Sequence, residues 1–160
     1  MGCDIHVAVQ KKTANGYVTV KTECKWWEMD YDEEDRYTIE VIDCARDYAL
    51  FGILSGVRNR DMPRMEAAVS GLPENVDGYT EKEVGYLAEY HDYHSHTWLE
   101  MADLERVHAD PVFEYEEEWE GKINKYTPLK DFYKTVRDEL DYLLPGVPDE
   151  DIRIIVYYDN

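Results

Sequence analysis

Apolar and polar residues alternate over residues 3–10. One face of this extended segment carries a thiol and three aliphatic side chains, and the opposite face carries Asp4 and His6. The segment TANG, at 13–16, has the composition of a turn, and the alternation then resumes. The pattern therefore predicts a β-hairpin over residues 3–23 whose apolar face joins the core.

Helical patterns follow the hairpin. They predict helices over residues 46–57, 80–92, 102–109 and 127–146, the last with Thr127 as its cap and Pro128 in its first turn. The segment HSHTWLEM, at 94–101, alternates again and predicts an extended segment. FEYEEEWEG, at 113–121, is too charged for a core and predicts an edge or a loop. The chain closes on DIRIIVYYDN, whose β-branched and aromatic residues predict a strand.

Strands at both ends with helices between them predict the α+β class. We expect a mixed or antiparallel sheet that includes the N-terminal hairpin and the C-terminal strand, with helices packed on one face. The two terminal strands are expected to be neighbours in that sheet. The sequence shows no repeat and no linker, so residues 1–160 are expected to form one domain.

The charge is strongly negative, since 17 Lys and Arg stand against 36 Asp and Glu for a net charge of −19. Such a field repels nucleic acid and anionic membranes, so neither is expected as a direct partner.

The 3 cysteines are an odd number, form no CxxC, and follow no signal peptide, so we expect a reducing cytoplasm. No apolar run reaches the length of a membrane span. The composition leaves a homo-oligomer open.

Two short polar pairs carry the candidate chemistry. Asp4 and His6 are two positions apart on one predicted strand, and His94 and His96 are two positions apart on another. Residues i and i+2 of a strand share a face, so each pair can converge on one point. Asp159, near the end of the last strand, can join them.

Three interpretations of this set stay open. Asp4, His6, His94 and His96 can bind a divalent metal that activates water. Without a metal, two histidines can act as general base and general acid on a phosphodiester while Asp4 orients one of them. In the third interpretation the histidines are structural, because such short patterns arise often by chance.

Other residues are candidates for binding a substrate. The segment VRNRDMPR, at 57–64, is locally basic, and Arg58 with Asn59 can hold phosphate. Tyr93 and Trp98 interleave with the histidines and can stack on a base. The alternative for the arginine is pairing with neighbouring acids, and the alternative for the aromatic residues is core packing.

Several motifs together resemble a group of small phage and prophage proteins. These begin with MGCDIH and carry segments like LFGILSGVRN (50–59), HSHTW (94–98) and a final VYYDN, in this order along the whole chain. The resemblance implies a phage origin and a shared pocket. It points to Cys3, Asp4, His6, Arg58, Asn59, His94, His96, Trp98, Asp159 and Asn160. This polar set favours a site over a purely structural family.

These features lead to an expected function in the cytoplasm of an infected host. We expect a phage anti-defence hydrolase, a phosphodiesterase that cleaves a small cyclic nucleotide immune signal with a His/Asp centre. A divalent metal is open as a cofactor. Two alternatives belong to other classes: a non-catalytic protein that sequesters the nucleotide signal, and an acidic DNA mimic that inhibits a DNA-binding host protein.

Overall fold

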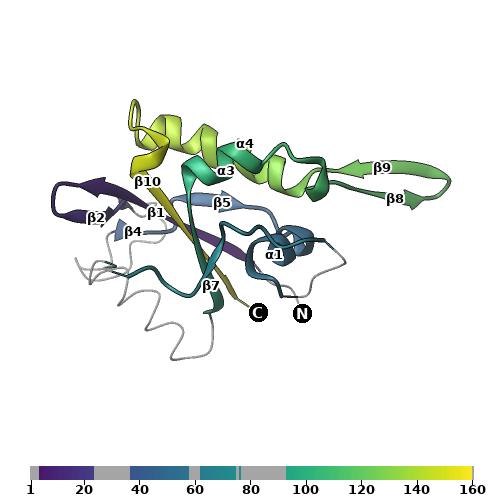
Figure 1. Cartoon of the computed structure of the whole chain (residues 1–160), viewed down its shortest axis with the longest axis horizontal. Helices are drawn as coiled ribbons and strands as arrows, with labels where there is room; N and C mark the ends of the chain where they lie inside the picture. Colours follow the sequence, from purple (N-terminus) through teal and green to yellow (C-terminus); the bar gives the residue numbers. More distant parts are fainter. Residues whose placement is uncertain (1–3, 24–36, 58–61, 75, 77–92, 160) are drawn as a thin grey trace.

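A 6-stranded sheet forms the centre of the structure, with strand order β2-β1-β10-β7-β6 and with β5 also paired to β1 (Figure 1). The computed structural model describes residues 4–23, 37–57, 62–74, 76 and 93–159, without the side chain of Tyr93. The strands are β1 (Ile5–Thr13), β2 (Gly16–Thr19), β5 (Ile42–Cys44), β6 (Val69–Ser70), β7 (Tyr93–Glu100) and β10 (Ile152–Asp159). The antiparallel sheet with helices confirms the predicted α+β class.

The two terminal strands are neighbours, as the sequence predicts. β1 and β10 pair antiparallel in an unbroken register that runs from Ile5 opposite Tyr158 to Lys11 opposite Ile152. β1 and β2 form the expected N-terminal hairpin. On the other side of β10 lies β7, so the segment containing His94 and His96 is a strand as expected. β10 is therefore a central strand, and all its residues from Ile152 to Tyr158 are buried.

The helices of the described ranges pack on one face of this sheet. They are α1 (Tyr48–Ser55), α3 (Met101–Val107) and α4 (Pro128–Leu143), with short 3-10 turns η3 (Pro111–Phe113) and η4 (Asp149–Asp151). α4 buries a stripe of apolar residues, Leu129, Phe132, Val136 and Leu140, against the sheet. None of these helices is long and apolar enough to cross a membrane. The helix predicted over 80–92 lies outside the described residues.

The opposite face of the sheet carries a second, smaller apolar cluster. Ala8, Ile155 and Tyr157 form it together with Ile39, and Trp98 packs against it. Arg153 lies on the same face, where its guanidinium donates to Gln10 Oε1 and covers the ring of Trp98 at 5.6 Å. Because β10 is covered on both faces, its sequence is a nearly continuous apolar run rather than a strict alternation.

Two further pairs of strands lie outside the central sheet. β3 (Thr22–Glu23) pairs with β4 (Tyr37–Thr38), and β8 (Tyr115–Trp119) pairs with β9 (Lys122–Tyr126). The β8–β9 hairpin extends away from the rest of the molecule (Figure 1). Residues 116–119 of the charged segment at 113–121 are therefore an exposed edge, one of the two expected outcomes, whereas Phe113 at its start is buried in the core.

The buried stripe of α4 makes a prediction about stability. Leu140 is fully buried, whereas Tyr142 on the same helix is 82% exposed. Leu140→Ala should lower the free energy of unfolding by about 3 kcal/mol, because it removes buried methyl groups and leaves a cavity. Tyr142→Ala is the matched control and should change it by less than about 0.5 kcal/mol. Equal effects in denaturant titrations would contradict this packing.

Candidate functional site

The pairing of the chain ends places a carboxylate beside His6. The backbone N–H of Asp4 donates to Asp159 Oδ1 at 3.0 Å, and the backbone N–H of Asp159 donates to the Asp4 carbonyl at 3.3 Å. His6 is two residues further along β1, and its Nε2 lies 3.3 Å from Asp159 Oδ2. The structure thus brings Asp159 to the first of the two predicted pairs.

A second carboxylate lies on the other side of the same ring. His6 Nδ1 is 3.1 Å from Glu40 Oε1. Glu40 follows β4, where its backbone N–H donates to Thr38 Oγ1, and the Tyr157 hydroxyl donates to its carboxylate at 3.4 Å. The His6 side chain is only 17% exposed. Both ring nitrogens of a mostly buried imidazole therefore face acidic side chains, an arrangement we call the His6 clamp (His6, Glu40 and Asp159).

The clamp sets the charge of the imidazole. Burial by itself lowers the pKa of His6, because it disfavours the charged form. The hydrogen bonds and charges of Glu40 and Asp159 act in the opposite direction and together outweigh burial, so the pKa of His6 is raised. The imidazolium form is thus favoured over a wider pH range than in a free histidine.

Asp4 has a different partner and a different protonation behaviour. Arg46 lies beside it, with Nε in contact with Asp4 Oδ1 and with Nη2 donating to Asp4 Oδ2 at 2.9 Å. These bonds lower the pKa of the Asp4 carboxyl. The negative charge of Asp159 also acts on Arg46. Arg46 therefore brings a positive charge to the edge of the His6 clamp.

The clamp opens into a groove of about 660 Å³. Its described lining consists of Asp4, Ile5, His6, Thr22, Glu23, Thr38, Glu40, Val41, Ile42, Asp43, Cys44 and Glu139. This lining contains acidic side chains at five positions and neither lysine nor arginine. Cys44 is a free thiol whose pKa is raised to about 12 by burial and by the charge of Asp43, so it is not a reactive nucleophile.

The second predicted pair does not converge. His94 lies opposite Tyr158 and packs near Phe51 on the helical face, whereas the ring of His96 stacks near Tyr157 on the other face. Ser95 between them has a φ of 54°, and the β7–β10 register shifts between Val156 and Tyr158. This irregularity reverses the alternation at one residue. The expectation that His94 and His96 share a face is therefore wrong.

His96 and His6 face the same aromatic ring from two sides. The His6 ring is 5.3 Å from that of Tyr157, and the His96 ring is 6.2 Å from it. β10 thus separates the two histidines, because it lies between β1 and β7. Burial, with the nearby charge of His94, lowers the pKa of His96, which favours the neutral ring. The four predicted metal ligands are not gathered, and the described part of the chain holds no group of three or more residues suited to a metal.

The other predicted residues have varied positions. Trp98 is on the second face of the sheet, packed beside Arg153, and has no place in the groove. Tyr93 begins β7, but its side chain is outside the described set. Cys3, Arg58, Asn59 and Asn160 also lie outside the described residues. The nearby Arg64 donates to the Ala68 carbonyl and to Ser70 Oγ, which gives it a structural role.

Sequence reasoning missed two members of this site, Glu40 and Arg46. Both flank β5, a strand of only three residues that pairs with the start of β1. A strand this short has no readable alternation, so its pairing could not be predicted. The one sequence feature that pointed to this part of the site was Arg46, a basic residue just before Asp47, the N-cap of α1.

Comparisons with known protein families, with curated proteins and with solved structures found no match for this chain.

The His6 clamp predicts a pH-dependent contribution to stability. Because the folded-state pKa of His6 is raised, the contribution is full below about pH 6.5 and is lost as the pH rises through the folded pKa. His6→Gln should therefore lower the free energy of unfolding more at about pH 5.5 than at about pH 9. The loss at the lower pH should exceed the loss at the higher pH by up to about 1 kcal/mol. A difference that is equal at both pH values, or larger at the higher one, would contradict the clamp.

Proposed function

We propose that this protein is a hydrolase in which the His6 clamp performs metal-free acid–base catalysis. The observation that carries the proposal is the imidazole held between Glu40 and Asp159 at the wall of an open groove. A histidine whose one nitrogen is fixed by a carboxylate and whose other nitrogen is near a second titratable group is a common acid–base arrangement. Its raised pKa suits a proton donor near neutral pH.

The proton route follows from the two sides of the ring. In the proposed route Asp159 stays on the Nε2 side of the ring, and Nδ1, which faces Glu40 and the groove, is the nitrogen that transfers protons. The His6 imidazolium gives its Nδ1 proton to the leaving oxygen as the bond to that oxygen breaks. Glu40 takes a proton from the attacking water as the new bond to the water oxygen forms. That proton then passes from Glu40 back to Nδ1 across their 3.1 Å contact, which restores the starting state.

The substrate that we propose is a phosphodiester in a small cyclic nucleotide, an immune signal of the host that a phage protein would remove. The acidic lining of the groove opposes an anionic substrate and therefore requires a positive charge near the phosphate. Arg46 meets this requirement, because Asp4 engages only part of its five N–H donors. We assign Arg46 to phosphate binding, in addition to the predicted Arg58.

Turnover by the His6 clamp is testable with purified protein. Cyclic dinucleotides and bis(p-nitrophenyl) phosphate should be hydrolysed, and EDTA should leave the rate unchanged. His6→Gln should lower kcat by about 100-fold or more, because it removes the proton donor. His108→Gln is the matched control, since His108 stacks on Tyr133 outside the groove, and should keep full activity.

Three results would overturn this proposal. Absence of turnover of every substrate, with and without divalent metal, would contradict a hydrolase. Recovery of an intact bound nucleotide after heat denaturation would instead favour sequestration. Activity that EDTA abolishes and a divalent metal restores would contradict the metal-free route.

The role of Arg46 makes a separate prediction. Arg46→Gln should raise KM by about tenfold or more with a smaller change in kcat, because a hydrogen-bonded charge on the phosphate is lost. Arg106→Gln is the control, since Arg106 is an exposed residue paired with Asp103 on α3. An unchanged KM for Arg46→Gln would exclude this residue from phosphate binding.

A further inference from the structure

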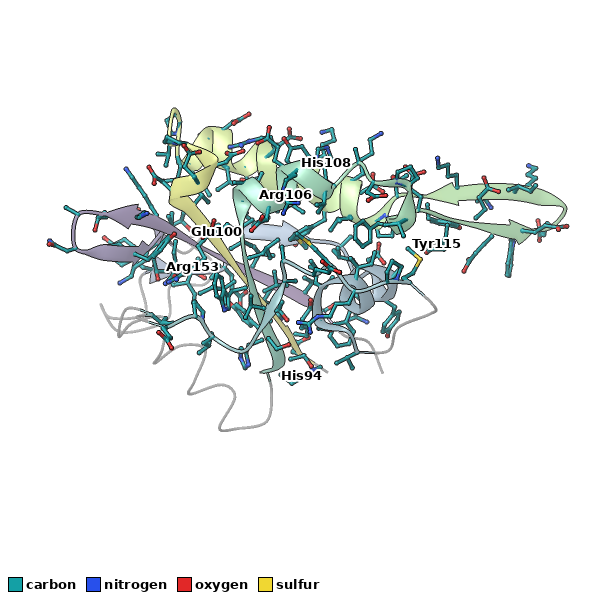
Figure 2. All side chains as sticks on the ribbon, viewed as in Figure 1. His94, Glu100, Arg106, His108, Tyr115 and Arg153 are labelled. Atoms are coloured by element: carbon teal, nitrogen blue, oxygen red, sulfur yellow. The ribbon has the colours of Figure 1, made fainter. Side chains whose placement is uncertain are left out.

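The β8–β9 hairpin forms an arm (residues 115–126) that extends from the body of the molecule (Figure 1). Its base is anchored, because Tyr115 packs against the core and stacks on Tyr126 with ring centroids 4.9 Å apart (Figure 2 labels Tyr115). At its tip, Glu120 and Gly121 have φ values of 51° and 76°. Two consecutive positive φ values are typical of the type I′ turn that fixes hairpin register. The arm is therefore a preformed two-stranded ribbon.

The arm exposes large apolar side chains that are not buried in the core. Trp119 is 72% exposed and Ile123 is 70% exposed. An isolated two-stranded hairpin has little stability of its own in water. Tryptophan is also among the side chains enriched in residues that dominate protein interfaces. Both features are typical of an arm that is completed by a binding partner.

The outer edge of β8 is open and acidic. Within the described part of the chain, β8 pairs only with β9, so its other edge presents backbone groups that can accept a further strand. Glu116, Glu117 and Glu118 occupy the middle of β8. In register, Glu116 faces Lys125, Glu117 faces Asn124 and Glu118 faces Ile123, and the ammonium of Lys125 pairs with Glu114. A strand added beside β8 would place its own side chains next to three glutamates.

We propose that the open edge of β8 binds an extended, basic segment of a partner protein by strand addition, with Trp119 as the apolar anchor. Lysine or arginine in the added strand complements the three glutamates, since opposite charges on neighbouring strands stabilise the pairing. A second copy of this chain is a poorer occupant, because each copy carries a net charge of −19. Pairing β8 with β8 of a second copy would also set glutamate against glutamate.

The test uses the full chain and a fluorescein-labelled heptapeptide of alternating lysine and valine as the probe. Fluorescence anisotropy should show saturable binding. The triple variant Glu116→Lys, Glu117→Lys, Glu118→Lys should weaken binding at least tenfold, and Trp119→Ala should weaken it about tenfold. The matched control reverses three exposed charges on α4, with Asp131→Lys, Asp138→Lys and Asp141→Lys, and should weaken binding less than threefold.

Two further measurements separate strand addition from general charge attraction and from self-association. The same peptide, N-methylated at the amides of its pairing edge, keeps its charge but cannot pair, and should lose binding. Equal binding of the methylated peptide, or equal weakening by the α4 control, would overturn the proposal in favour of general charge attraction. Sedimentation should show a monomer, whereas a dimer that Trp119→Ala dissociates would make a second copy the occupant and overturn it.

Discussion

The antiparallel pairing of β1 with β10 is the interaction on which the rest of the structure depends. It joins the two ends of the chain from Ile5 and Tyr158 to Lys11 and Ile152, and it is covered on both faces by apolar clusters. β10 is buried from Ile152 to Tyr158, so the backbone groups of this pair must bond to each other. The same pairing carries Asp159 to His6. The pairing of β1 with β10 therefore both stabilises the sheet and sets the geometry of the candidate site.

The site combines a basic ring with an unusually acidic surrounding. The chain as a whole carries a net charge of −19, and acidic side chains gather in the described lining of the groove. Arg46 lies at the edge of this acidic lining, beside Asp4. This distribution explains why the His6 imidazolium is stabilised despite burial. The phosphate substrate proposed above would need a positive charge such as that of Arg46 beside it. The basic partner proposed for the arm rests on the same principle of charge complementarity.

Much of the fold could be predicted from the sequence, because long patterns average over many residues. The terminal strands, the helices over 48–55 and 128–143, and the strand containing HSHTW all follow from periodicity. The candidate site was harder to predict than the fold, because its geometry depends on the conformation of single residues. The positive φ of Ser95 sends His94 and His96 to opposite faces, and no residue pattern indicates such a bulge. Glu40 and Arg46 reach the site through the very short β5, which leaves no periodic signal.

The most direct test of the account is the titration of His6 by NMR, followed through its imidazole chemical shifts. The His6 clamp predicts a pKa above the ordinary value of about 6.5 in the wild type. In the double variant Glu40→Gln, Asp159→Asn the pKa should fall below the wild-type value, because burial remains while both charges are lost. A wild-type pKa at or below about 6.5, or one that the double variant leaves unchanged, would contradict the His6 clamp.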